Sequence, residues 1–332
     1  MKGGFETMLY LNQQTIESSI TMEEMIDAME EAYRVYADKK YQMPTRMQVQ
    51  QNSNTMILMP CITDQAIATK LLTSFPENKD KPVIQGLVIL NDSQNGEVLA
   101  IMDGNFITGF RTGALGGAAV RRLAKPDAER LAVIGAGVQG FYQTLAACAA
   151  HSFNEIYITN RTYEKLEPLI DRLHERLPDD IAIYPCHSAE EAIQHADVVI
   201  TATSSPDPVL PDHQELLKGK LIIGIGSFQP TMREFPRQLY ALCDHFFIDS
   251  EDAMKESGDV IQAIEANWYV KEDIQQFSDV VQINSFDAEE YWRNHPEGSV
   301  IFKSTGMGLF DVIAANVIHE KVMLSEVGTK LE

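Results

Sequence analysis

The sequence predicts an α/β protein with two domains: a doubly wound parallel sheet and an α+β domain. Three observations lead to this prediction. A glycine-rich turn joins a short apolar strand to a helix within residues 130–150. Strands and helices alternate after that turn, which is typical of a parallel sheet. Before it, several strands follow one another with no helix between them, which predicts a separate sheet.

The N-terminal part begins with an amphipathic helix predicted over residues 22–38. Thr21 is a favourable N-cap, and Glu24 stands at the capping-box position. A helix rich in Gly and Ala is predicted over Thr108–Leu123, where small residues permit close packing. Between the two helices lie strand-like runs and one hairpin turn: 46–50, 55–59, 67–74, 85–91 and 98–103, with the turn at 91–96.

The glycine-rich turn follows Lys125-Pro126, where the second domain is predicted to start. Gly135, Gly137 and Gly140 have the G-x-G-x-x-G spacing between an apolar strand and the helix over 141–150. The first glycine permits the tight turn, the second lets backbone approach a diphosphate, and the third lets helix and strand pack closely. The diphosphate would sit at the helix N-terminus, where free N–H groups favour an anion. The pattern predicts a Rossmann-type dinucleotide-binding domain.

The end of the next strand indicates which dinucleotide binds. Residues 155–159 are strand-like and lead into Asn160, Arg161 and Thr162. An NAD-binding unit usually places Asp or Glu here, on the ribose 2′-hydroxyl, and this chain has none at that place. Arg161 can pair with a 2′-phosphate, and its neighbours can add neutral donors. The pattern favours NADPH, with NADH as the alternative; a surface loop that happens to contain an arginine is the other interpretation.

Strands and helices continue to alternate to residue 249. The segments after two of the strands, 203–206 and 226–230, are either walls of a nicotinamide pocket or ordinary strand-exit turns. An amphipathic helix over 308–322 is expected to return to the first domain, because the sheet looks complete before it. The predicted domains are thus 1–125 with 306–332, and 126–305. The alternating elements are helices at 163–176 and 189–195 and strands at 181–184, 197–202, 221–225 and 246–249.

Composition limits the possible partners and locations. The 48 acidic residues outnumber the 27 basic ones, and the formal charge of −21 opposes nonspecific nucleic acid binding. The four cysteines are widely spaced and read as reduced thiols. With no apolar signal core at the N-terminus and no apolar run of membrane-spanning length, we expect a cytoplasmic protein without a membrane partner. The histidines show no metal-ligand spacing, so no catalytic metal is expected.

Three bases in the first domain are candidates for binding an anionic substrate. Arg46, Lys70 and Arg111 each stand within or beside an apolar element. One such base is usually a surface side chain whose stem covers apolar groups. Three of them beside a nucleotide domain can converge on a carboxylate, which arginine binds in bidentate fashion.

The chain resembles the ornithine cyclodeaminase/mu-crystallin family from about residue 8 to residue 325. The resemblance rests on a series of motifs that occur in the family's order: Met43-Pro-Thr-Arg46, Met59-Pro60, Lys70, Asp103-Gly104, Thr108-Gly-Phe-Arg-Thr-Gly113, Val133-Ile-Gly-Ala-Gly-Val-Gln139, Asn160-Arg-Thr162, Gly226-Ser-Phe-Gln-Pro-Thr-Met-Arg-Glu234 and Lys303-Ser-Thr-Gly306.

The resemblance implies a homodimer whose N-terminal domain, completed by the C-terminal helix, binds the substrate and dimerises. It also implies that Arg46, Lys70 and Arg111 hold the substrate carboxylate. Asn160, Arg161 and Thr162 resemble the 2′-phosphate contacts of members that use NADPH. The full set of expected cofactor-binding residues is Thr112, Gly135, Gly137, Val138, Gln139, Asn160, Arg161, Thr162, Thr201, Ala202, Thr203 and Ser227.

Two departures from the family pattern bear on the reaction. Cyclodeaminases of the family carry a glutamate where this chain has Ile57, and an aspartate where it has Phe228. Apolar side chains neither accept nor donate protons. Their presence argues against cyclisation of ornithine with release of ammonia, and it suits the family's reductases and dehydrogenases.

The resulting hypothesis is an NAD(P)H-dependent reductase of cyclic imino acids. The leading substrate is Δ1-pyrroline-2-carboxylate, which gives L-proline; Δ1-piperideine-2-carboxylate, which gives L-pipecolate, is a close variant. Lys70 and Arg111 are the predicted catalytic residues, and Arg46 and Phe228 join them in binding substrate. Asp311 would pair with an active-site base or tune its protonation, or it is simply an acid in the first turn of a helix.

Ornithine cyclodeaminase stays an alternative that the two departures disfavour, and three other functions remain open. An amino acid dehydrogenase such as alanine dehydrogenase would need a base to activate water or ammonia, and the sequence identifies none. A condensing, opine-type dehydrogenase would need a roomier pocket. The chain could also be an NADP-dependent binder of small molecules that turns over little. Retention of all three candidate bases favours turnover over binding alone.

Overall fold

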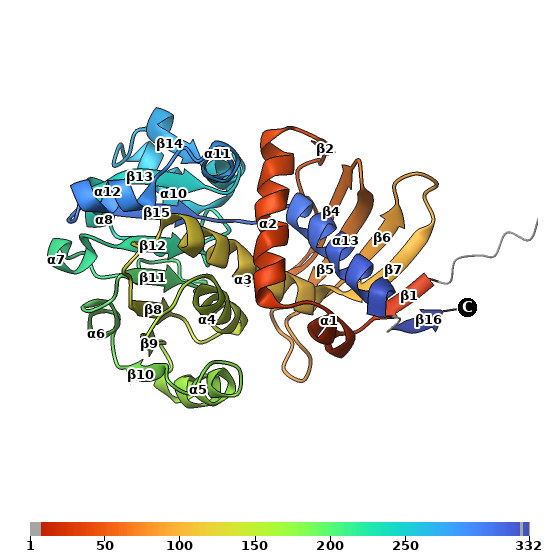
Figure 1. Cartoon of the computed structure of the whole chain (residues 1–332), viewed down its shortest axis with the longest axis horizontal. Helices are drawn as coiled ribbons and strands as arrows, with labels where there is room; N and C mark the ends of the chain where they lie inside the picture. Colours follow the sequence, from red (N-terminus) through yellow and green to blue (C-terminus); the bar gives the residue numbers. More distant parts are fainter. Residues whose placement is uncertain (1–7, 326–327, 332) are drawn as a thin grey trace, which may run out of the picture. The chain divides into compact units, whose positions relative to one another are not determined.

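The computed structural model describes residues 8–325 and 328–331, which form two compact units (Figure 1). The first unit comprises the described residues up to Arg111 and from Met307 onward. The second unit comprises Thr112–Gly306. Helix α3 (Gly104–Leu123) contributes residues to both. Within the described ranges, no helix has the length and apolar character needed to cross a membrane.

The first unit is built on a mixed sheet in the order β16-β1-β7-β6-β5-β4-β2, with β3 paired to β4. Only β1 and β7 run parallel, and the other neighbours are antiparallel. The predicted separate sheet is therefore confirmed, and strands β1 and β16 extend it beyond the predicted runs. Its strands are β1 Met8–Leu11, β2 Tyr41–Gln42, β3 Met47–Gln51, β4 Asn54–Thr63, β5 Ala66–Ser74, β6 Ile84–Asp92, β7 Val98–Asp103 and β16 Thr329–Leu331.

Helices cover one face of this sheet. The predicted capping box of α2 (Met22–Ala37) is present, because Thr21 and Glu24 each accept the other's backbone N–H. Helix α13 (Gly308–Ser325) packs against α2 and across β4, β5 and β6 (Figure 1). It also contacts the short helix α1 (Gln13–Ser19). The prediction that α13 is amphipathic is wrong. Every residue from Gly308 to Ala315 is buried, since a helix between another helix and a sheet has little need of a polar face.

Helix α3 begins at Gly104 instead of at Thr108. The Asp103 side chain accepts the backbone N–H groups of Asn105 at 3.0 Å and Phe106 at 2.9 Å, which supports the earlier start. The expected close packing is present in the second unit: a Cβ on Gly113 would lie 2.7 Å from the Tyr142 carbonyl oxygen.

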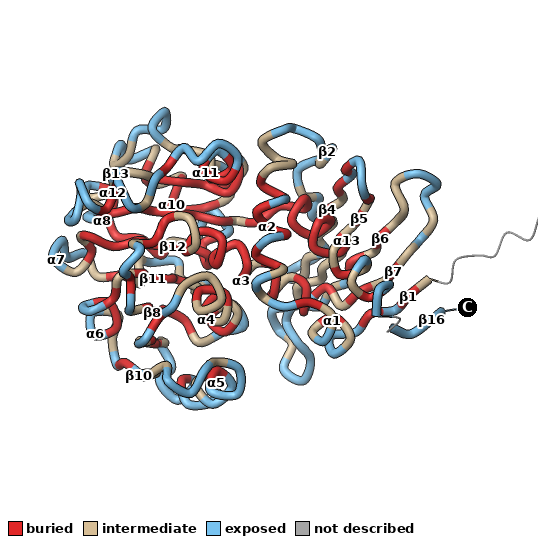
Figure 2. The backbone as a smooth tube through the Cα atoms, viewed as in Figure 1, coloured by how far each residue is buried: buried red, intermediate tan, exposed pale blue. Residues whose placement is uncertain are grey.

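The second unit contains a parallel sheet in the order β10-β9-β8-β11-β12-β15-β13-β14. All of its pairings are parallel. The predicted doubly wound sheet is confirmed, and helices α4 and α5 lie on one side of it, with α6 and α7 on the other (Figure 1). Its central strands are buried over most of their length, as both faces are covered (Figure 2). The strands are β8 Arg130–Ile134, β9 Glu155–Thr159, β10 Ala182–Cys186, β11 Val198–Thr201, β12 Leu221–Gly224, β13 Cys243–Ile248, β14 Ile274–Gln276 and β15 Ser299–Lys303.

The sheet is not complete where the sequence suggested. Strand β15 inserts between β12 and β13, although it is the last of this sheet's strands in the sequence, and β14 forms the edge beside β13. All five residues of β15 are buried. A run this short gives little periodic signal in the sequence, so the strand was not predicted. The helices are α4 Val138–Ala150, α5 Leu166–His174, α6 Ala189–Ile193, α7 Gln214–Leu217, α8 Arg237–Leu242, α9 Ala253–Glu256, α10 Gly258–Glu265, α11 Phe277–Ile283 and α12 Ala288–Asn294, with 3-10 turns η1 Tyr163–Lys165 and η2 Lys271–Asp273.

Candidate functional site

The glycine-rich turn connects β8 to α4 with little steric freedom. Gly135 has a φ of +119°, and its N–H donates to the Thr159 carbonyl at 2.9 Å. A Cβ on Gly140 would lie 2.0 Å from the Gly135 carbonyl oxygen, so glycine is required for the close approach. Gly137 caps α4 without a side-chain hydrogen bond, and a Cβ there would meet no atom within 4 Å. The first-turn N–H groups therefore suit a bound diphosphate.

A pocket of about 510 Å³ adjoins this turn. It lies where the strand order reverses between β8 and β11, the place at which doubly wound sheets bind ligands. The predicted cofactor-binding residues that line it are Gly135, Gly137, Asn160, Arg161, Ala202 and Thr203. The remaining lining residues are Ile134, Ala136, Thr159, Lys165, His187, Ser188, Ala189, Ser204, Ser205 and Val209.

The other predicted cofactor-binding residues do not line this pocket. The Thr201 side chain is fully buried at the end of β11. Ser227 is also fully buried, and its hydroxyl donates to the Met232 carbonyl at 2.6 Å. The Thr201 hydroxyl is buried without a hydrogen-bond partner among the described residues, whereas Ser227 makes local hydrogen bonds. The remaining ones outside the lining are Thr112, Val138, Gln139 and Thr162.

Asn160 connects the glycine-rich turn to the turn after β9. Its side-chain oxygen accepts the Ala136 N–H at 3.1 Å, and its amide donates to the Thr162 carbonyl at 2.8 Å. The carboxamide thus fixes the backbone on both sides of Arg161. Because Arg161 is exposed and lines the pocket, its guanidinium is available to a ligand there.

Two titratable lining residues, Lys165 and His187, were missed by sequence reasoning. Lys165 ends the 3-10 turn that follows Arg161, and the ring of His187 stacks on Tyr163 with 4.2 Å between centroids. The predicted continuous helix over 163–176 concealed Lys165, since the 3-10 turn replaces its first part. No acidic residue is among the described residues that line the pocket. This end of the pocket is therefore positively charged.

The first unit contains a buried cluster of three charged side chains. Lys70 on β5 places Nζ 2.7 Å from Oδ2 of Asp311 on α13. Arg111 on α3 places Nε 3.0 Å from Oδ1 of the same carboxylate. Lys70 and Asp311 are each 1% exposed, and Arg111 is 4% exposed. Of the two interpretations of Asp311, the structure thus supports pairing with the bases.

The electrostatics of this cluster leave it positively charged. Desolvation lowers the pKa of Lys70 to about 8, and the charges of Arg111 and Arg46 act in the same direction, against the opposing effect of Asp311. The charge of Arg46 is therefore felt at Lys70. The Nη1 atom of Arg111 is buried without a hydrogen-bond partner in the described protein. Two cations share one carboxylate, so a second anion would be stabilised here.

The two apolar replacements lie in different units. Ile57 is half-buried on β4, on the sheet face that also carries Met59 and the paired Leu72. Phe228 follows β12 in the second unit, and 38% of it is exposed. Lys70, Arg111 and Ile57 thus belong to one unit and the predicted Phe228 contact to the other.

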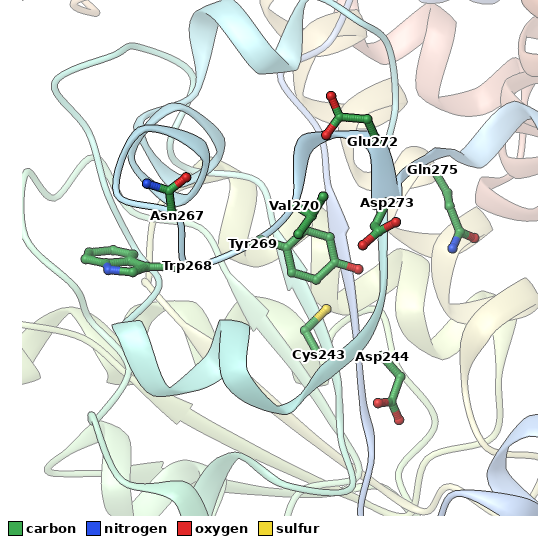
Figure 3. Close-up of a pocket in the computed structure, with 9 residues that line it drawn as sticks. All are labelled: Cys243, Asp244, Asn267, Trp268, Tyr269, Val270, Glu272, Asp273 and Gln275. Atoms are coloured by element: carbon green, nitrogen blue, oxygen red, sulfur yellow. The ribbon is translucent and has the colours of Figure 1, made fainter.

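A second depression, of about 620 Å³, lies beside β13 and β14 (Figure 3). Asp244, Glu272 and Asp273 give it negative charge. Burial raises the pKa of the Cys243 thiol, whose sulfur lies near the Tyr269 ring in Figure 3, so this cysteine is a poor nucleophile. None of the predicted site residues lines it. Across residues 8–325 and 328–331, no cluster of three or more His, Cys, Asp or Glu side chains could hold a metal ion.

Comparison with known proteins places these features in one family. The model of the ornithine cyclodeaminase/mu-crystallin family matches residues 6–326. A Δ1-pyrroline-2-carboxylate reductase of Bacillus cereus is 31% identical over 98% of this chain and 100% of that protein. The Δ1-pyrroline-2-carboxylate reductase of Thermococcus litoralis, solved with NADH and L-proline, matches with a TM-score of 0.89 and 28% identity over 98% of this chain and 100% of that one. An archaeal alanine dehydrogenase dimer with bound NAD matches with a TM-score of 0.88 and 29% identity over 98% and 99%.

Proposed function

The chain belongs to the ornithine cyclodeaminase/mu-crystallin family, and on this basis we propose that it is an NAD(P)H-dependent oxidoreductase that reduces the C=N bond of cyclic imino acids. The leading substrate is Δ1-pyrroline-2-carboxylate, reduced to L-proline, and Δ1-piperideine-2-carboxylate is the close variant. The observation that carries the proposal is the buried cluster in which Lys70 and Arg111 share the single carboxylate of Asp311. A substrate carboxylate balances the remaining positive charge.

The residues of the cluster bind and orient the substrate. Lys70 and the Nη1 edge of Arg111 hold the carboxylate, and Arg46 adds a third positive charge. Fixing the carboxylate fixes the adjacent C2 atom, which is the position that accepts the hydride. A protonated imine becomes a neutral amine when hydride arrives, so this step needs no further proton donor. Ile57 and Phe228 are apolar where a cyclodeaminase has proton-exchanging residues, which suits a reaction that activates no water.

The second unit fits a nicotinamide dinucleotide. When bound, this cofactor supplies the hydride from C4 of its nicotinamide. The glycine-rich turn offers the diphosphate the free N–H groups of α4, and the adjoining pocket follows the edge of the sheet. Arg161 and Lys165 line the pocket, with no acidic residue among its described lining, and this charge supports a preference for NADPH over NADH.

We further propose a homodimer formed through the first unit. Helices cover one face of its sheet, and the opposite face carries apolar side chains in register, with Leu58 beside Leu71 and Leu71 beside Leu87. Leu87 is 41% exposed, more than Leu58 or Leu71. A second copy would bury this face.

We also propose a cytoplasmic location. The four cysteines form no disulfide, which supports this proposal.

The proposal is tested by following the absorbance of reduced nicotinamide with purified protein. We expect rapid oxidation of NADPH with Δ1-pyrroline-2-carboxylate, slower oxidation of NADH, and no comparable rate with pyruvate plus ammonia. Activity on pyruvate and ammonia alone would replace the proposal with an alanine dehydrogenase. Binding of either nucleotide with no turnover of any of these substrates would leave a small-molecule binder.

A further inference from the structure

Glu234 joins two turns that leave neighbouring strands of the second sheet. Its Oε1 accepts the backbone N–H of Thr203 at 2.7 Å and the Thr203 hydroxyl at 2.9 Å. Its Oε2 accepts the N–H of Gly226 at 2.8 Å and that of Ser227 at 3.1 Å. Thr203 follows β11 and Gly226 follows β12, which are parallel neighbours. One carboxylate therefore satisfies donors from both turns.

The two turns approach each other so closely that their spacing depends on this contact. A Cβ on Gly226 would lie 1.9 Å from the Thr203 carbonyl oxygen and 2.5 Å from Oε1 of Glu234. The main chain of the same region adds ties, with the Arg233 N–H donating to the Ser205 carbonyl at 2.8 Å. The backbone of the pocket wall thus rests directly on the turn after β12.

Behind Glu234 lies a second, fully buried layer of charge. Nζ of Lys303 is 3.7 Å from Oε2 of Glu234 and 3.2 Å from Oδ2 of Asp259. All three side chains are 0% exposed. Asp259 in turn accepts the N–H of Glu234 at 2.7 Å and that of Phe235 at 2.9 Å. The carboxylate of Glu234 is held from both the turns and the core.

The hydrogen bonds require the ionised form of Glu234. Burial raises the pKa of this carboxyl, and Lys303 and the donors of Thr203 oppose that effect. Four donors point at its two oxygens, so a protonated oxygen would face donors with a hydrogen of its own. An amide in its place would create the same conflict.

The place of the turns along the sheet indicates which half of a dinucleotide they serve. Arg161 lies after β9, the glycine-rich turn lies after β8, and Thr203 lies after β11. With the 2′-phosphate end at β9 and the diphosphate at the turn after β8, the rest of the molecule extends past β11 towards β12. The turns that Glu234 joins are therefore next to the nicotinamide half.

We propose that Glu234 is a positioning residue that sets the spacing of the Thr203 and Gly226–Ser227 turns. These turns form the binding surface for the nicotinamide ring. This inference rests on the proposed cofactor. Glu234 does not itself line the pocket, and it acts through the turns. Its loss weakens binding of the nicotinamide half and leaves the adenosine half as it was.

The test compares two pairs of ligands, and the members of each pair differ only in the nicotinamide base. Binding of NADPH and of 2′-phospho-ADP-ribose, and of NADH and ADP-ribose, is measured by titration calorimetry for the full-length protein and for Glu234→Gln. We expect Glu234→Gln to weaken the dinucleotide about tenfold or more, the scale of losing charge-assisted hydrogen bonds, while the nucleotide without nicotinamide changes less than about twofold. Thr203→Val removes one donor only, so it folds more safely, and it shifts the dinucleotide affinity in the same direction by a smaller factor.

Asp197→Asn is the matched control. This carboxylate accepts the N–H groups of Glu129 and Arg130, both at 3.1 Å. Asp197 precedes β11, so it lies at the N-terminal ends of the strands, away from the pocket at their C-terminal ends. The substitution should lower thermal stability without changing the affinity for any of the four ligands. Equal weakening of both members of a pair in Glu234→Gln, or no weakening in either Glu234→Gln or Thr203→Val, would overturn the positioning role. Wild-type protein that binds none of the four ligands would instead overturn the proposed cofactor, and the inference with it.

Discussion

The Nζ atom of Lys70 lies 2.7 Å from Oδ2 of Asp311, and both side chains are 1% exposed. The same carboxylate holds Arg111 through its other oxygen, so a strand and two helices from both ends of the chain meet in one charge cluster. An ion pair at this depth contributes little net stability, since desolvation of the charges offsets their attraction. We therefore interpret the cluster as a binding feature: it keeps two cations in place for the carboxylate of a substrate.

Asp311→Asn tests the cluster through stability. The amide has the same shape as the carboxylate but leaves Lys70 and Arg111 without their counter-ion. We expect the free energy of unfolding in urea to fall by about 3–5 kcal/mol, the scale for breaking one side of a buried pair. The value of kcat/KM for the imino acid should fall as well, because the cations are no longer held in place.

Glu289→Gln is the control for this substitution. Glu289 pairs with Arg293 on α12, but the two side chains are 72% and 66% exposed. An exposed pair contributes about 0–1 kcal/mol, so this variant should unfold like the wild type. If Asp311→Asn lowered the free energy of unfolding no more than Glu289→Gln does, Asp311 would not be the counter-ion of Lys70 and Arg111.

The pH dependence of kcat/KM tests the charge of Lys70. Its pKa is lowered to about 8, so in the free enzyme the ammonium is present below that pH and is lost above it. Because the charged form holds the substrate carboxylate, kcat/KM should decline as pH rises through about 8. In Lys70→Arg the guanidinium stays protonated, and the decline should move to higher pH. An unchanged decline in Lys70→Arg would assign it to loss of the imine proton instead.

Much of the fold follows from local sequence signals. The capping box at Thr21, the strands of the first sheet and the glycine-rich turn at Gly135 each have a short-range cause, and each is present. The places where prediction failed depend on distant contacts. Strand β15 is stabilised by insertion between β12 and β13, and the first half of α13 is buried on every side because α2 and the sheet enclose it.

The candidate site shows the same limit. Chemical character made Lys70 and Arg111 candidates, and only the family resemblance implied that they bind a carboxylate. That they share one carboxylate could not be inferred from spacing, because Asp311 lies at the other end of the chain. Glu234 likewise reads as an ordinary loop acid, and only the geometry shows that it satisfies four donors from two turns.

Arg161→Ala tests the cofactor preference. Arg161 and Lys165 line the pocket after β9, and Asn160 holds the backbone of this turn. Removal of the guanidinium should weaken NADPH about tenfold or more and leave NADH nearly unchanged, because only NADPH carries the 2′-phosphate. Fluorescence titration of both reduced nucleotides measures the ratio. Lys165→Ala should change it in the same direction, whereas equal effects on both nucleotides would remove the phosphate-binding role of this turn.

Leu87→Lys tests the proposed dimer. Leu87 lies beside Leu71, which lies beside Leu58, and this row faces away from the helices of the first unit. In a monomer the lysine stays in water, whereas in the dimer its ammonium would be desolvated in an apolar interface at a cost of several kcal/mol. Light scattering after size exclusion should therefore give a dimer for the wild type and a monomer for the variant. Ile283→Lys is the matched control, since Ile283 is 70% exposed on α11 of the second unit, and it should remain dimeric. A Leu87→Lys protein that is as dimeric as the wild type would exclude this sheet face from the interface, and a monomeric wild type would refute the dimer itself.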